Sequence, residues 1–143
     1  MTYEDTLAYV PLLAHLTREE LQALAKSCRE GQFKAGTTLT SQGDTGVGLY
    51  ILTSGKVRIT QTKSPGGTEV ELGTAGPGDV LGEMALLDDL PRSATLTAIV
   101  DVTALLLPVW AFRTTLRSHP DIALKLLSVL SRRVRQAEDR SYE

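Results

Sequence analysis

The chain has 143 residues, of which 42% are hydrophobic and 22% are charged, and its formal net charge at pH 7 is −2. This length and composition exclude a disordered chain, and we expect residues 1–143 to form a single domain. The slight acidity argues against a general nucleic-acid-binding surface. The one cysteine, Cys28, rules out an internal disulfide.

The N-terminal segment lacks the pattern of a targeting signal. Glu4 and Asp5 stand where a secretory signal carries positive charge, and no apolar run approaches the roughly 18 residues that span a membrane. We therefore expect no membrane segment and a cytoplasmic protein.

Residues 1–30 are predicted to form the N-terminal helices. Thr17 and Glu20 have the spacing of a capping box, which begins a second helix. Cys28 follows Leu24 by four residues, the spacing of one helix face, so we expect it to be a buried helical residue rather than a reactive thiol.

Residues 31–108 change to short alternating runs punctuated by Gly, Pro, Asp and Ser, a pattern typical of β-strands. The strand-like runs are Leu49–Leu52, Val57–Thr60, Glu69–Leu72, Thr95–Val100 and Val102–Leu107. Their spacing predicts a mainly β fold with flanking helices, in which a cupin-like antiparallel β-roll or jelly-roll barrel forms the centre. No Lys-Ser or Lys-Thr follows the glycine clusters as a nucleotide-triphosphate loop requires, so turns are predicted at glycines such as Gly43, Gly46 and Gly48.

The helical period returns over residues 109–143. A short helix over Trp110–Leu116 is interrupted at Ser118-His119-Pro120, and a long C-terminal helix follows from Asp121. The long helix carries an apolar stripe of Ile122, Leu126, Leu127, Val129, Leu130, Val134 and Ala137. This stripe needs cover, either from the chain's own barrel or from a second copy of the chain.

The run from Gly82 onward combines features that suit an anionic ligand. Gly82 lets the backbone approach a ligand closely, and the amides of Met84, Ala85 and Leu86 are expected to begin a helix without intrahelical acceptors. Asp88 and Asp89, which follow, are predicted to be solvated turn residues.

Two charged side chains complete this run. Arg92 can add a bidentate, charge-assisted contact to the same anion. Glu83 only accepts hydrogen bonds when ionised, so it is expected to receive a donor such as a sugar hydroxyl. Phosphate and a free hydroxyl on one ring suggest a cyclic nucleotide.

The runs Gly82–Leu87 and Pro91–Thr95 closely resemble the phosphate-binding cassette of the cyclic nucleotide-binding domain family, which includes the catabolite activator protein and the regulatory subunits of protein kinase A. The similarity extends through Gln42–Asp44, Tyr50–Val57 and Gly76–Leu81, in the order that the family uses. We call residues 82–95 the cassette.

The resemblance implies that Arg92 binds the exocyclic phosphate oxygens and Glu83 the ribose 2′-hydroxyl. The predicted ligand-binding residues are Gly82, Glu83, Met84, Ala85, Arg92, Ser93 and Leu72. His15 and His119 fall outside the predicted strands, where a cupin places metal ligands, so we expect a binding module with no metal, no cofactor and no catalytic residue.

Cyclic AMP is the expected ligand and cyclic GMP the alternative. Ser93 stands where many members that prefer cyclic GMP have Thr, and because it also carries a hydroxyl, it excludes neither nucleotide. Ala137-Glu138 align with a Thr-Ser pair that contacts adenine in the catabolite activator protein, so adenine contacts of that kind are not expected here.

For the output of the domain, the resemblance implies signalling through the C-terminal helix, to a second copy of the chain or to an effector protein. No helix-turn-helix follows that helix, so direct DNA binding is not expected. The chain is then a stand-alone module or a piece of a longer protein. A β-barrel scaffold that binds no nucleotide is the alternative from another class.

Overall fold

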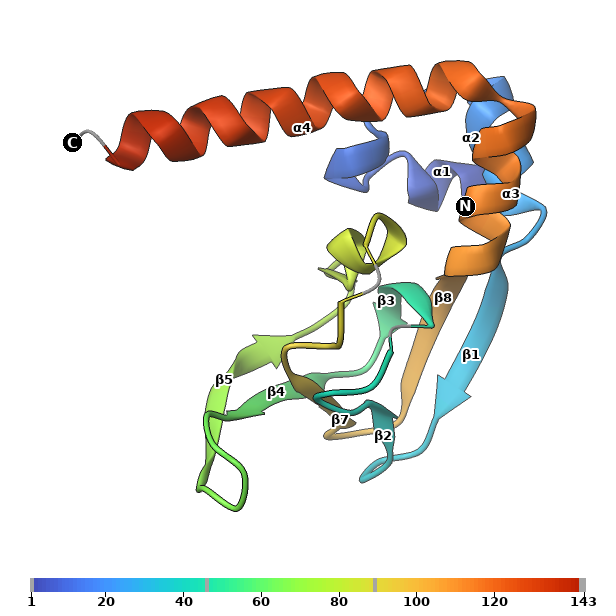
Figure 1. Cartoon of the computed structure of the whole chain (residues 1–143). Helices are drawn as coiled ribbons and strands as arrows, with labels where there is room; N and C mark the ends of the chain where they lie inside the picture. Colours follow the sequence, from blue (N-terminus) through green and yellow to red (C-terminus); the bar gives the residue numbers. More distant parts are fainter. Residues whose placement is uncertain (1, 46, 89, 142–143) are drawn as a thin grey trace. The chain divides into compact units, whose positions relative to one another are not determined.

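The computed structural model describes residues 2–45, 47–88 and 90–141. They form two compact units, one within Met1–Lys26 and Ala111–Glu143 and the other within Ser27–Trp110. The first consists of helices, and the second contains the strands together with a short helix (Figure 1). We call them the helical unit and the β-roll unit. Gly46 and Asp89, both predicted to lie in turns, fall outside the described residues.

In the described part of the β-roll unit, eight strands form two antiparallel sheets of four strands. The first sheet has the order β1 (Arg29–Phe33), β8 (Val102–Pro108), β3 (Gly48–Ser54) and β6 (Val80–Leu81). The second has the order β2 (Thr38–Thr40), β7 (Thr95–Ala98), β4 (Val57–Thr62) and β5 (Glu69–Ala75). The predicted antiparallel β-roll is confirmed.

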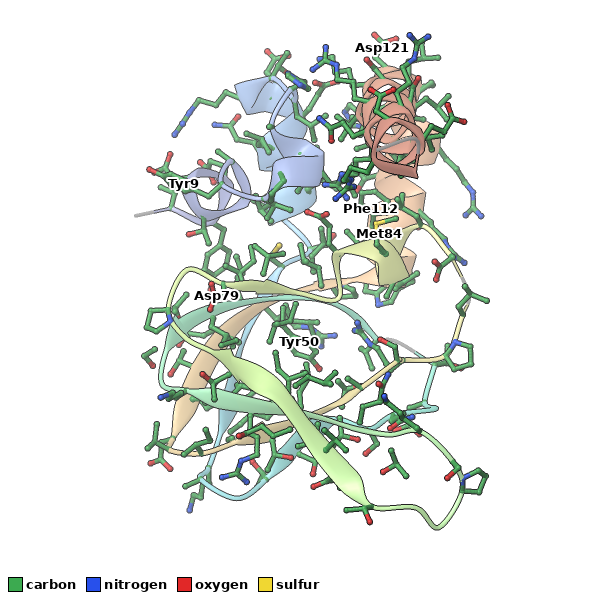
Figure 2. The ribbon with its side chains drawn as sticks, turned by 90° about the vertical axis from the view of Figure 1, so that its left-hand side faces the viewer. Tyr9, Tyr50, Asp79, Met84, Phe112 and Asp121 are labelled. Carbon is green, nitrogen blue, oxygen red and sulfur yellow. The ribbon has the colours of Figure 1, made fainter. Side chains whose placement is uncertain are left out.

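An apolar interior lies between the two sheets. Alternate residues of β3, Tyr50 and Leu52, point into it, and Figure 2 shows Tyr50 inside the roll. The other sheet contributes Val57 from β4 and Leu96 from β7. The ring of Phe33 meets that of Tyr50 edge-on, with centroids 6.1 Å apart. Burial of this interior is the main force that holds the two sheets together.

The start of the roll differs from the prediction. The second helix ends at Ala25, and β1 already begins at Arg29, so Cys28 lies in the connection between them rather than in a helix. The cysteine is nevertheless buried, and burial raises the pKa of its thiol to about 12. Because β1 is a polar edge strand, its sequence has no apolar alternation to reveal it.

In the described chain, four α-helices and one short 3-10 helix, Pro11–Leu13, come before or after the roll. The α-helices are α1 (Tyr3–Leu7), α2 (Arg18–Ala25), α3 (Val109–Ser118) and α4 (Pro120–Ser141). The predicted capping box is confirmed, since Thr17 Oγ1 accepts from the Glu20 amide at 3.2 Å and Glu20 Oε1 from the Thr17 amide at 2.8 Å. In the part of the chain that the model describes, no helix is both long enough and apolar enough to cross a bilayer.

The apolar stripe of α4 divides into two faces. Ile122 and Leu126 are buried, whereas the side chains of Leu127 and Val134 are 62% and 56% exposed. Leu126 and Leu127 lie on different sides of the helix, because successive residues are about 100° apart around its axis, and cover of the exposed side by a second copy stays a prediction. Lys125, on the buried side, donates to Glu20 of α2 at 2.6 Å.

Candidate functional site

The backbone of Arg92 is paired with a loop far away in the sequence. Its amide donates to the Asp44 carbonyl at 2.8 Å, and its carbonyl accepts from the Gly43 amide at 2.8 Å. Thr45 and Pro91 extend this pairing by one antiparallel bridge. Two consecutive cassette residues, Pro91 and Arg92, are thus fixed to the segment before β3 by a short two-stranded arrangement.

The Arg92 side chain turns inward from this anchor and is half-buried. Its Nη2 donates to the carbonyl of Gly48 at the start of β3. Its Nε is buried and has no hydrogen-bond partner among the described residues. Burial lowers the pKa of Arg92, and the nearby Tyr50 hydroxyl partly opposes this change. Burial likewise raises the pKa of Tyr50, and the charge of Arg92 partly opposes that change. A guanidinium remains charged at neutral pH, so the unpaired N–H at Nε belongs to a positively charged group.

Gly82 provides the space for this guanidinium. A Cβ added to Gly82 would lie 2.0 Å from Arg92 Nη1 and 2.8 Å from its Cζ. Gly82 also has a φ of +81°, in the left-handed region that favours glycine. The structure therefore brings together the two cassette residues that the sequence analysis placed around one anion.

Gly48 is a second glycine that the site requires. It was predicted to lie in a turn, but it is the first residue of β3. A Cβ on Gly48 would lie 2.1 Å from the carbonyl oxygen of Leu107, so no larger residue fits where the strand passes β8. The carbonyl that accepts from Arg92 is consequently fixed by close strand packing.

Between Gly82 and Arg92 the chain forms a short 3-10 helix, η2 (Glu83–Leu86). Glu83 is half-buried at its start, and Met84 is 45% exposed on its outer side (Figure 2). The Ala85 amide donates to the Gly82 carbonyl at 3.1 Å. The expectation that this amide lacks an intrahelical acceptor is therefore wrong, because a 3-10 turn uses an amide that an α-helix leaves free.

Two predicted site residues, Ser93 and Leu72, lie outside η2. Ser93 is exposed and follows Arg92 directly, and its carbonyl accepts from Gln61 Nε2 at 2.8 Å. Leu72 lies on the edge strand β5, where the register shift opposite Ile59 and Thr60 makes it the extra residue of a β-bulge, and it is 54% exposed. Gly82 and Arg92 are thus in contact, Ser93 adjoins them along the chain, and Leu72 comes from a separate strand.

Gly48, Tyr50, Gln42 and Gln61 were not predicted as site residues, although the first three lie in or beside the segments that carry the family resemblance. Gln61 had a weaker signal. Residues 57, 59 and 61 lie on the same face of β4, and Gln61 is polar where Val57 and Ile59 are apolar.

Other polar groups near the cassette give no sign of a metal centre. Among the residues that the model describes, no group of three or more His, Cys, Asp or Glu side chains could hold a metal ion. Asp88 Oδ1 accepts from the Leu90 amide at 3.2 Å, which makes it the turn residue that was predicted.

Known proteins resemble this chain over almost its whole length. A family model for the cyclic nucleotide-binding domain matches residues 30–119. The CRP-like cAMP-activated global transcriptional regulator of Mycobacterium tuberculosis is 33% identical over 136 residues, which are 95% of this chain and 60% of the regulator. This chain therefore spans three fifths of that relative's length.

Two solved structures show the same fold. The N-terminal domain of a transcriptional regulator from Streptomyces coelicolor has a TM-score of 0.85 and 38% identity, over 96% of this chain and 95% of that one. The regulatory domain of Toxoplasma gondii PKA, solved with cAMP, has a TM-score of 0.74 and 25% identity, over 94% of this chain and 49% of that one.

Proposed function

We propose that this chain, which belongs to the cyclic nucleotide-binding domain family, is a sensor that binds cyclic AMP in the β-roll unit. The observation that carries the proposal is the buried Arg92 Nε, a donor of a charged group without an acceptor among the described residues. A buried donor left unpaired costs about 1–3 kcal/mol, and a phosphate oxygen supplies the acceptor that it lacks.

The roles of the other residues follow from their chemistry and position. Arg92 contacts the exocyclic phosphate oxygens, and Glu83 accepts from the ribose 2′-hydroxyl. Gly82, Met84, Ala85 and Ser93 line the ligand along the cassette. Leu72 offers exposed apolar surface that could cover the flat face of a base. None of these roles needs a bond to be made or broken, so we propose binding rather than catalysis.

For the ligand, the relatives favour cyclic AMP over cyclic GMP. The M. tuberculosis regulator is described as cAMP-activated, and the T. gondii domain was solved with cAMP. Ser93 retains a hydroxyl after Arg92, which keeps cyclic GMP as the alternative.

For the output, we propose that the ligand shifts the equilibrium between two arrangements of α4, and that α4 passes the change to a second copy of the chain or to an effector protein. Such a shift requires the ligand to bind one arrangement more tightly than the other. Exposed Leu127 and Val134 on α4 supply apolar surface for either partner. The net charge of −2 supports partners other than DNA for these 143 residues.

Isothermal titration calorimetry with cyclic AMP and cyclic GMP tests the proposal. Arg92→Ala should lose about 2–4 kcal/mol of binding free energy, because it removes a charge-assisted, bidentate contact. Arg58→Ala is a matched control, since Arg58 is an exposed arginine of β4 that pairs with Glu71 at 3.2 Å. If neither nucleotide binds, or if Arg92→Ala binds as the parent does, the chain is better described as a scaffold that binds no nucleotide.

A further inference from the structure

The ladder between β4 and β7 stops beside the cassette, and side chains continue it. The last backbone pair of the two strands is Thr60 with Thr95. One residue further along β4, Gln61 Nε2 donates to the carbonyl of Ser93 at 2.8 Å. A side-chain amide thus anchors the backbone immediately after Arg92 to the sheet.

Gln42 forms a second anchor, on the loop that pairs with Arg92. Its side-chain amide donates to the Thr62 carbonyl at 2.7 Å and accepts from the Thr62 amide at 2.8 Å, as a neighbouring strand would. Its own backbone amide donates to Thr95 Oγ1 at 2.9 Å. The loop that follows is therefore fixed to β4 and β7.

The two anchors meet at Arg92. Gly43 and Asp44, the residues after Gln42, exchange backbone hydrogen bonds with Arg92, each 2.8 Å long. The Gln61 anchor fixes the next residue of the cassette. The backbone of Arg92 is consequently held on one side through Gln42 and on the other through Gln61.

We propose that Gln42 and Gln61 are positioning residues for Arg92, which set where its guanidinium meets the ligand's phosphate. This inference rests on the proposed function. Gln42 is exposed and Gln61 is half-buried, and their hydrogen bonds lie at the protein surface. Exposed hydrogen bonds contribute little to the free energy of unfolding, so their removal acts mainly on the position of Arg92.

Gln61→Leu tests the idea, because it removes the donor with little change in size. We expect cyclic AMP affinity to fall about 3- to 10-fold, the range of one hydrogen bond. Discrimination between the Rp and Sp phosphorothioate forms of cyclic AMP should also fall, since it depends on the guanidinium's position. The affinity lost on removing the 2′-hydroxyl should stay the same, because that group faces Glu83.

Two comparisons separate positioning from general damage. In an Arg92→Ala background, Gln61→Leu should cause no further loss, because a positioning residue acts through its target. Gln32→Leu is the matched control, an exposed glutamine on β1 of the other sheet, and it should bind as the parent does. An equal loss in both backgrounds, or an unchanged Rp to Sp ratio, would overturn the inference.

A measurement without ligand keeps the test independent of the proposed function. Hydrogen exchange of the Arg92 amide, which donates to Asp44, should become faster in Gln61→Leu and remain unchanged in Gln32→Leu. Unchanged exchange in Gln61→Leu would refute the positioning role. A parent protein that binds no cyclic nucleotide would refute the proposed function instead, and the exchange rates would still decide whether Gln61 holds Arg92.

Discussion

Replacing Gly82 with alanine should weaken the cyclic nucleotide far more than a simple change of backbone strain can explain. The new Cβ would lie 2.0 Å from Arg92 Nη1 and 2.8 Å from Cζ and Nη2. These atoms belong to the end of a flexible side chain, so the guanidinium moves while the backbone stays in place. The variant therefore displaces the phosphate contact without deleting it.

Two separate costs follow from this geometry. A residue other than glycine at a φ of +81° loses roughly 1–2 kcal/mol of stability, because its Cβ approaches the following carbonyl. The displaced guanidinium loses binding free energy approaching that of Arg92→Ala, about 2–4 kcal/mol. Urea unfolding measures the first cost, and titration calorimetry with cyclic AMP measures the second.

Gly36→Ala is the matched control for the first cost. Gly36 has a φ of +87°, and a Cβ added there would meet nothing within 4 Å. We expect it to lose a similar free energy of unfolding and to keep full affinity. If Gly82→Ala binds cyclic AMP as tightly as Gly36→Ala does, or if it loses the same affinity once Arg92 is already alanine, then the contact between Gly82 and Arg92 does not determine binding.

Three further predictions concern other parts of the chain. Glu83→Ala should lose about 1–2 kcal/mol of binding free energy for cyclic AMP but almost none for its 2′-deoxy analogue, which lacks the donor; equal calorimetric losses would give Glu83 another role. Burial raises the pKa of Glu20, but hydrogen bonds from Lys125 and Thr17 outweigh it and leave that pKa lowered. The ionised Glu20 therefore stabilises the fold above its unfolded pKa and stops doing so as the pH falls through the lower, folded one. Lys125→Met should cost about 1 kcal/mol in urea unfolding at pH 7 and progressively less as the pH falls through the folded pKa of Glu20, and a cost independent of pH would contradict this. Val134→Glu should give monomers in sedimentation velocity if α4 pairs with a second copy, and a parent that is monomeric with and without ligand would exclude that pairing.

The strands that the sequence predicted carry apolar runs, which are continuous in β3 and β8 and alternate with polar residues in β4, β5 and β7. β3, β4 and β8 each place alternate residues in the interior of the roll, and all three were predicted close to their observed bounds. β1, β2 and β6 were not predicted, because β1 is polar and the other two contain only three and two residues. In such short or polar strands the partner strand decides the conformation, and a single sequence does not show the partner.

The features of the candidate site that could be predicted are likewise those encoded in one local run of sequence. The pairing of Gly82 with Arg92 could be predicted, because residue type and spacing within one run indicate an anion site. The contribution of Gly48 could not be predicted, and Gln61 showed only as a polar residue in an apolar row, because each contribution depends on which distant strand ends meet at the cassette. The wrong prediction for the Ala85 amide has a local cause, because the sequence does not distinguish a four-residue 3-10 helix from the first turn of an α-helix.

The proposed function gives Arg92 a second task beside its contact with Gly48, and the two together explain why an arginine suits this position. One nitrogen, Nη2, is used by the Gly48 carbonyl, while Nε on the adjoining edge of the same planar group has no acceptor among the described residues. A guanidinium holds its five N–H donors in a fixed fork, so the bond to Gly48 also fixes the direction of the donors that remain for a phosphate. A lysine also has three N–H donors, but they lie on one rotating ammonium group, so a bond to Gly48 would not fix the direction of the others. The fold therefore uses one donor of Arg92 to orient the others, and the glycine at position 82 leaves the space in which they can do so.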